Sequence, residues 1–135
     1  MVQPLYFTIS ELCNSDTAKK HNINNAPRTM TQINNMVNLI HYVLQPLREK
    51  LGKPIIVTSG FRCKELNEKV GGVANSQHTT GEAADIYVNG CKVGMLLNYI
   101  RTSGIEFDQL INEHNQWVHI SYSHKHNRKQ ILVIK

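Results

Sequence analysis

The chain has 135 residues, of which 41% are hydrophobic and 19% carry a charged side chain. This length suffices for one hydrophobic core and excludes a second domain of ordinary size, so we expect a single domain over residues 1–135. The formal net charge of +5 indicates either an anionic partner or a basic face that keeps the protein soluble. The basic residues are scattered and lack interleaved aromatic residues, so we expect no nucleic-acid partner.

Residues 1–25 show no apolar run that is flanked by basic residues and followed by a small-residue cleavage site. No apolar stretch is long enough to span a membrane. We therefore expect synthesis in the cytoplasm without an ordinary secretion signal, and no membrane partner. Cys13, Cys63 and Cys91 are odd in number and irregularly spaced, which predicts reduced thiols rather than a disulfide framework or a cysteine zinc site.

The first half of the chain is predicted to be helical. Two short helical turns are expected near the start, capped by Ser10 and Asp16. The longest helix is expected to begin at Thr29, to kink at Pro46 and to end at Gly52. Its apolar residues recur at intervals of three and four, which is typical of a helix that buries one face in a core. They are Met30, Ile33, Met36, Val37, Ile40, Val43, Leu44, Leu47 and Leu51.

The second half is predicted to be rich in strands, with the first of them, 54–59, buried. The strands are expected at 54–59, 82–88, 107–113, 117–122 and 131–134, and helices at 64–69 and 93–103. Helices that precede a mainly antiparallel sheet predict an α+β fold, in which the N-terminal helices pack on the sheet.

Two candidate metal ligands flank a tight turn. His78 and Asp85 are seven residues apart on either side of Gly81, and on one straight strand they would face opposite ways. Only a reversal of the chain near Gly81 lets both side chains converge. A third candidate, His119, lies in the predicted strand 117–122, on the face opposite Val118. Two His and one Asp leave one position open, which is typical of a catalytic zinc site.

Each of these residues alone is also common in an ordinary loop or strand. Their combination is what indicates a metal site. Residues 76–85 follow the pattern Ser-x-His-x-x-Gly-x-Ala-x-Asp, and residues 117–119 read Trp-x-His. These motifs resemble those of the zinc D-Ala-D-Ala carboxypeptidase and peptidoglycan endopeptidase family, the M15 peptidases. The segment Ser59-Gly60-Phe61-Arg62 is similar to the Ser-Gly-Tyr-Arg segment of the family, with Phe61 in place of Tyr. Residues 7–12 and 44–48 are similar to the short, phage-type members, so the resemblance covers nearly the whole chain.

The resemblance implies one Zn²⁺ per chain, held by His78, Asp85 and His119, and hydrolysis of a peptide bond in peptidoglycan stem peptides. Either a D-Ala-D-Ala carboxypeptidase or an L-Ala-D-Glu-type endopeptidase fits the motifs. A phage or prophage lytic enzyme that acts on the cell wall would explain the lack of a secretion signal, and a missing or trimmed leader would explain it equally well. A basic protein concentrates near acidic wall polymers. The alternative is a zinc-containing wall-binding or phage structural module without turnover. We expect a monomer.

The general base is predicted to be Glu113. Related enzymes often carry an acid three residues before the last ligand, His119, but this chain has Gln116 there, which is a poor proton acceptor. A short reversal through residues 114–116 would place Glu113 beside or diagonal to His119, and the short phage-type members also carry Glu in this place. Glu82, in the turn of the metal motif, is the rival. Asp108 is disfavoured by its strand phase.

Arg62 is the second predicted catalytic residue. It follows a strand and a Ser-Gly turn, so its guanidinium can hold a substrate carboxylate or a developing oxyanion through two hydrogen bonds. The alternative is an ion pair with Glu65 or Glu68 on the following helix.

Ser76 and Gln77 are expected to orient the neighbouring imidazole or to contact substrate. His124 and His126 are two residues apart in a polar loop and are expected to be solvated. Trp117 can either pack under the metal or form the floor of the substrate cleft, and we expect it to pack in the core.

Overall fold

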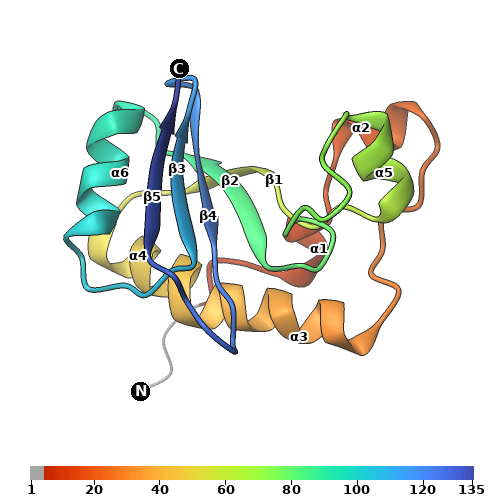
Figure 1. Cartoon of the computed structure of the whole chain (residues 1–135), viewed down its shortest axis with the longest axis horizontal. Helices are drawn as coiled ribbons and strands as arrows, with labels where there is room; N and C mark the ends of the chain where they lie inside the picture. The colour runs from red at the N-terminus through yellow and green to blue at the C-terminus, as the bar shows by residue number, and fades with distance from the viewer. Residues whose placement is uncertain (1–4) are drawn as a thin grey trace.

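The computed structural model describes residues 5–135. Most of its helices lie in the first half of the chain, and all but one of its strands lie in the second (Figure 1). The helices are α1 (Ile9–Leu12), α2 (Asp16–Lys20), α3 (Met30–Leu39), the π-helical turn η1 (Ile40–Leu44), α4 (Gln45–Leu51), α5 (Lys64–Lys69) and α6 (Val93–Arg101). The strands are β1 (Ile56–Ser59), β2 (Ala83–Tyr87), β3 (Gln109–Glu113), β4 (Trp117–Ser121) and β5 (Gln130–Ile134).

The strands form one sheet in the order β1-β2-β4-β3-β5. Every neighbouring pair is antiparallel except β3 and β5, which are parallel. The prediction of an α+β fold with a mainly antiparallel sheet is confirmed. The prediction that the first strand is buried is wrong, because β1 is an edge strand and its residues are half-buried or exposed.

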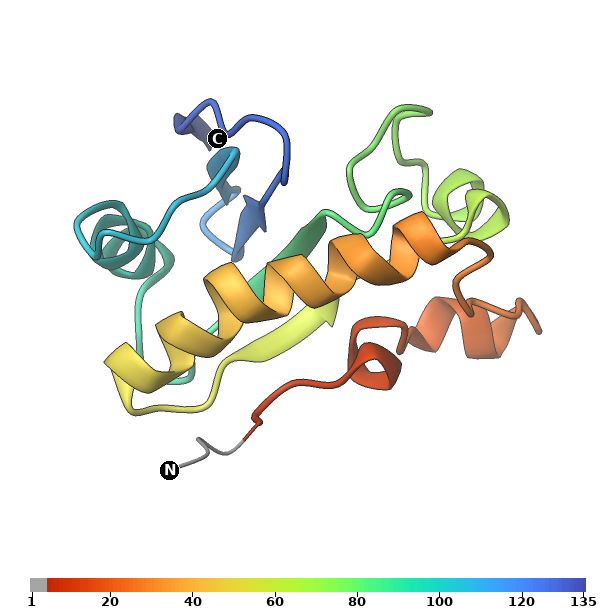
Figure 2. The ribbon, with the colours of Figure 1, turned by 90° about the horizontal axis from the view of Figure 1, so that it is seen from below.

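The long helix predicted from residue 29 to residue 52 is one continuous run of α3, η1 and α4 (Figure 2). Thr29 caps its start in a capping box with Gln32, and Gly52 ends it in the left-handed conformation at φ 67°. The irregularity expected at Pro46 is the π-helical turn directly before it, in which the Gln45 N–H bonds to the Ile40 carbonyl. Since proline has no N–H and its ring clashes with the carbonyl four residues back, the wider turn accommodates it.

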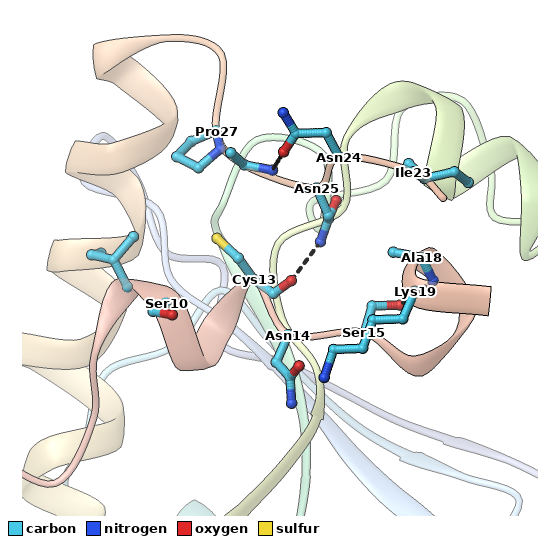
Figure 3. Close-up of a pocket in the computed structure, with 12 residues that line it drawn as sticks. Ser10, Cys13, Asn14, Ser15, Ala18, Lys19, Ile23, Asn24, Asn25 and Pro27 are labelled. Atoms are coloured by element: carbon cyan, nitrogen blue, oxygen red, sulfur yellow. Dashed lines mark hydrogen bonds between the residues drawn. The ribbon is translucent and has the colours of Figure 1, made fainter. Parts of the chain in front are cut away.

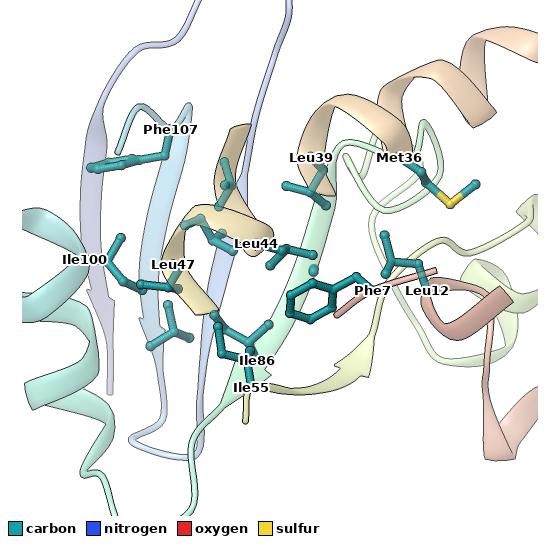
Figure 4. Packing of buried hydrophobic residues seen from close by; sticks show 14 of the residues in the cluster. Phe7, Leu12, Met36, Leu39, Leu44, Leu47, Ile55, Ile86, Ile100 and Phe107 are labelled. Carbon is teal, nitrogen blue, oxygen red and sulfur yellow. The ribbon is translucent and has the colours of Figure 1, made fainter. Parts of the chain in front are cut away.

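The predicted helix stripe forms much of the core, together with side chains from the sheet and α6 (Figure 4). Met36, Val43, Leu44 and Leu47 are fully buried, and so is Leu39, which the stripe did not include. Met30 and Val37, which the stripe did include, are mainly exposed. Met36, Leu39, Val43 and Leu47 recur at intervals of three and four, so the buried face of the helix is regular but differs before the π-helical turn from the one predicted.

The two short N-terminal helices begin at other caps than those predicted. The side chains of Thr8 and Ser15, rather than Ser10 and Asp16, accept the capping bonds of α1 and α2. Figures 1 and 2 show α2 and α5 side by side at one end of the molecule, away from α6. Within residues 5–135, no helix combines the length and the hydropathy that crossing a membrane requires.

Candidate metal centre

His78, Asp85 and His119 meet at the centre of the sheet. Asp85 on β2 and His119 on β4 are directly opposite in the antiparallel register. His78 reaches them from the turn before β2, where Gly81 has φ 84°. A Cβ at Gly81 would lie 2.6 Å from the Gln32 carbonyl oxygen, so glycine is required there for both conformation and space. The reversal predicted near Gly81 is confirmed.

The three side chains form a group with the dimensions of a zinc site. Asp85 Oδ1 lies 3.3 Å from His78 Nε2 and 3.1 Å from His119 Nδ1. Among the His, Cys, Asp and Glu side chains of residues 5–135, these three form the group that could share a metal. Their ligand atoms all lie within 4.8 Å of one another. Ligand atoms of a tetrahedral zinc bound at about 2.0 Å lie roughly 3.3 Å apart. The cluster therefore fits one zinc ion.

The neighbours of His78 and Asp85 set the tautomer of the first and the ionisation state of the second. His78 Nδ1 lies 2.7 Å from the Gly60 carbonyl oxygen; because a carbonyl only accepts, Nδ1 carries the proton and Nε2 keeps its lone pair for a metal. Burial acts to raise the pKa of Asp85, but hydrogen bonds and charges from His119 and His78, when these rings are protonated, outweigh it and hold the pKa well below its usual range. The buried carboxylate thus stays ionised.

The cluster opens into a cavity of about 450 Å³. Its wall includes every residue predicted for the site, namely Arg62, Ser76, Gln77, His78, Asp85, Glu113 and His119. Glu113 pairs with Trp117 across the β3–β4 hairpin, which makes it the diagonal neighbour of His119. Its Oε1 lies 3.8 Å from His119 Nδ1, so the carboxylate faces the cluster.

Trp117 lines this cavity and is only half-buried, so the prediction that it packs in the core is wrong. Its indole Nε1 donates a hydrogen bond of 3.0 Å to Glu113 Oε2. This bond holds one carboxylate oxygen and leaves the other, Oε1, toward His119. Strand alternation had placed Trp117 on the same face as His119, and that signal alone could have found it.

Arg62 lies on the cavity wall beside the cluster, with Nη2 3.6 Å from Asp85 Oδ2. Nε donates to Ser59 Oγ and Nη1 donates to Asn67 Oδ1. Within residues 5–135 its carboxylate partner is Asp85, not Glu65 or Glu68 on α5. Burial lowers the pKa of Arg62, partly offset by the charges of Asp85 and Glu113.

A buried asparagine that the sequence analysis did not single out holds the Arg62 segment in place. Asn25 Nδ2 donates to the carbonyls of Cys13 and Phe61, and Asn25 Oδ1 accepts from the Cys63 N–H at 2.7 Å. The Arg62 N–H in turn donates to the His78 carbonyl. No spacing along the chain points to this asparagine, because its partners lie as far as 38 residues away.

Ser76 and Gln77 are brought to the cavity, but the hydrogen bonds of their side chains within residues 5–135 go to groups other than the His78 ring. Ser76 Oγ accepts the His78 backbone N–H at 3.2 Å and so stabilises the turn. Gln77 Nε2 donates to Asp108 Oδ2 at 2.8 Å, while Gln77 Oε1 is buried without a partner in this part of the chain. The imidazole is oriented by the Gly60 carbonyl instead.

The rival base and the second histidine pair lie elsewhere. Glu82 accepts from Thr80 Oγ1 and borders a different cavity, together with His124. His124 and His126 are exposed, as expected for solvated residues. The structure therefore brings Glu113, and not Glu82, to the cavity of the metal cluster.

A larger cavity of about 530 Å³ lies between α1, α2 and residues 23–27 (Figure 3). Asn25 crosses its wall to bond the Cys13 carbonyl. Burial raises the pKa of the Cys13 thiol, which makes it a poor nucleophile at neutral pH. The wall of this cavity includes none of the clustered His and Asp side chains.

Two comparisons relate the chain to known proteins. A family model described as Peptidase M15 matches residues 5–121, a range that contains the cluster, Glu113 and Arg62. The chain is 32% identical over 125 residues to the zinc D-Ala-D-Ala carboxypeptidase of Streptomyces albus G. That alignment covers 87% of the chain and 46% of the relative, so the chain spans about half the length of the curated relative that it matches. The chain belongs to the peptidase M15 family.

Proposed function

We propose that this chain is a zinc-dependent peptidase that hydrolyses a peptide bond in peptidoglycan stem peptides. The observation that carries the proposal is the Glu113 carboxylate, which faces the His78, Asp85 and His119 cluster from 3.8 Å. A cluster that only stabilised the fold would need no such carboxylate. We propose Glu113 as general base, Arg62 as the second catalytic residue, and the cluster as the site of one Zn²⁺.

Hydrolysis requires a water nucleophile, a base and a group that stabilises negative charge on the carbonyl oxygen. Zinc, when bound, supplies a Lewis acid that acidifies water and polarises a carbonyl. Glu113 Oε1 takes the proton of the attacking water and returns it to the leaving amine, while Trp117 holds Oε2. Arg62 points its guanidinium into the same cavity and binds the oxyanion or a substrate carboxylate.

The substrate follows from the family and from the relative. The curated relative is a zinc D-Ala-D-Ala carboxypeptidase, and the cavity wall carries two arginines, Arg62 and Arg128, that suit an anionic peptide. Carboxypeptidase and L-Ala-D-Glu-type endopeptidase action both need the same centre. We propose that residues 1–135 act as one monomeric domain without nucleic-acid or membrane partners. Lysis of the cell wall by a phage or prophage is the setting proposed from the likeness to short phage-type members.

The test is turnover of purified peptidoglycan by the zinc-loaded chain, with mass spectrometry of the released fragments. Loss of a terminal D-Ala identifies a carboxypeptidase, and cleavage near the start of the stem identifies an endopeptidase. Fragments that stay intact would favour the alternative, a wall-binding or phage structural module that holds zinc without turnover.

Arg62→Lys separates two roles of this side chain. Lysine keeps the charge but loses the planar fork, so contacts that need two parallel N–H donors weaken. If Arg62 binds a ground-state carboxylate, KM rises with little change in kcat; if it stabilises the oxyanion, kcat falls, in either case by about 10-fold or more. Kinetics on a synthetic stem peptide decide between the two, with zinc content measured alongside. Unchanged constants would remove Arg62 from the site.

Trp117→Phe tests how the base is held. Phenylalanine keeps the ring but removes the indole N–H that bonds Glu113 Oε2, so the carboxylate samples more rotamers. We expect zinc content to stay and kcat to fall by about 10- to 100-fold, the equivalent of one hydrogen bond to a charged group. A shifted pH–rate profile, compared with that of the unchanged protein, identifies an effect on the base. A lower melting temperature with an unchanged kcat would leave Trp117 a packing role only.

A further inference from the structure

Asp108, which the sequence analysis disfavoured as a base, is a buried carboxylate that bonds two residues of the cavity wall, Gln77 and Arg128. Its side chain is only 4% exposed. Oδ1 accepts from the backbone N–H and from Nε of Arg128, each at 2.9 Å. Oδ2 accepts from Arg128 Nη2 and from Gln77 Nε2, each at 2.8 Å. These bonds, that of the Arg128 side chain first, hold the pKa of Asp108 well below its usual range.

The backbone brings Arg128 to this anchor from 20 residues away. The segment that connects β4 to β5 lies beside the residues at the start of β3. There the Lys129 N–H donates to the Phe107 carbonyl, and the Gln130 N–H donates to the Asp108 carbonyl. Lys129 takes the left-handed conformation, at φ 54°. A non-glycine residue rarely adopts it, so the turn that directs Arg128 toward Asp108 is specific.

Arg128 is clamped and yet accessible. Its side chain is 51% exposed, and it lines the same cavity as His78 and Glu113. A guanidinium has five N–H donors, and the bonds that Arg128 makes within residues 5–135 use Nε and Nη2 alone among them. The remaining donors lie on the outer edge of a group whose orientation is already set, so little conformational entropy opposes binding.

The two arginines of the cavity differ in what they face. Arg62 Nη2 points at Asp85 in the cluster, whereas Arg128 is held by Asp108, which also accepts a hydrogen bond from Gln77, the residue before His78. The cavity therefore presents a second planar fork, which is bonded to Asp108 and not to a member of the cluster. A planar fork of N–H donors is complementary to a carboxylate.

We propose that Arg128, positioned by Asp108, binds a carboxylate of the substrate peptide and so determines which anionic peptides the site accepts. The proposal rests on the peptidase function proposed above and adds the feature of the substrate that is recognised. A stem peptide offers that chemistry in two places, the free α-carboxyl of its Glu residue and its C-terminal carboxyl.

Equilibrium binding tests the proposal without turnover. The zinc-loaded Glu113→Gln protein is titrated by calorimetry with a synthetic stem peptide and with two analogues, one amidated at the Glu α-carboxyl and one at the C-terminus. Amidation of the recognised carboxyl is expected to weaken binding by about 10-fold, as for a hydrogen bond to a charged group. Adding Arg128→Gln is expected to abolish that difference, and adding Arg128→Lys to retain part of it. The analogue affected identifies which carboxyl is bound.

The measured quantity is the ratio of the Kd of the amidated analogue to that of the unamidated peptide. Lys129→Gln is the matched control, because it removes the same charge from the adjacent residue and is expected to leave this ratio unchanged. Asp108→Asn is expected to lower the ratio as Arg128→Gln does, since the fork loses its anchor. A lower melting temperature of Asp108→Asn with an unchanged ratio would mean a structural role only and would overturn the proposal. An unchanged ratio in Arg128→Gln, or no binding of any peptide, would overturn it as well.

Turnover of the unamidated peptide by the zinc-loaded parent protein is measured in parallel. If the peptide is hydrolysed but the Kd ratio does not depend on Arg128, the result contradicts the Arg128 proposal alone. A ratio that depends on Arg128 in a protein without turnover supports carboxylate binding and contradicts the peptidase function alone.

Discussion

Replacing any one of His78, Asp85 and His119 with Ala is expected to reduce the zinc content from about one ion per chain to none. The ligand atoms of these residues lie within 4.8 Å of one another, and two remaining ligands cannot complete a tetrahedral site. Asp85→Ala also removes the carboxylate that faces Arg62, which leaves a half-buried cation without this partner beside the site. Metal analysis of the purified proteins measures the effect, and hydrolysis of stem peptides is expected to disappear with the metal.

The matched controls are His124→Ala and His126→Ala. Both histidines are exposed and lie outside the cluster, so these proteins are expected to remain fully loaded. Circular dichroism of each ligand variant shows whether the fold persists. A folded His78→Ala protein that still binds zinc would refute the assignment of the cluster.

Glu113→Gln is expected to separate catalysis from metal binding. Glutamine keeps the shape of the side chain and an oxygen that can accept the Trp117 indole N–H, but it cannot accept the proton of the attacking water. Turnover is expected to fall by about two to four orders of magnitude, the usual contribution of a general base. Zinc content is expected to stay near one per chain, because Glu113 lies beside the cluster and not among its members.

Glu82→Gln is the paired control, since it makes the same chemical change at the rival residue. Glu82 borders another cavity, so its replacement is expected to leave kcat and KM unchanged. Near-normal turnover in Glu113→Gln together with a large loss in Glu82→Gln would move the role of the base to Glu82.

Local patterns were enough to predict the fold class and most elements. Strand alternation in residues 117–121 separates buried Val118 from His119, which faces the cavity, and the same alternation appears in the structure. The long helix begins at the Thr29 capping box and ends at the left-handed Gly52, as the sequence predicts. Such signals depend on neighbours within one or two turns of the chain, so they survive in a single sequence.

The candidate ligands could also be proposed from sequence, because the turn at Gly81 and the spacing of His78 and Asp85 are local, and because strand alternation indicated His119, with the Trp-x-His motif in support. That the three side chains converge was settled by the pairing of β2 with β4. The diagonal position of Glu113 was predicted from the shortness of the hairpin and agrees with the register of β3 and β4.

Only the tertiary structure decided how these groups are held. The Gly60 carbonyl that sets the His78 tautomer, the Asn25 side chain that fixes the Arg62 segment and the Asp108–Arg128 clamp join residues 18 to 38 positions apart. The sequence by itself determined the helices, the strands, the fold class and which residue types were available to bind a metal. Which distant polar groups become partners depends on the packing of the helices against the sheet, since a buried donor or acceptor bonds whatever the fold places beside it.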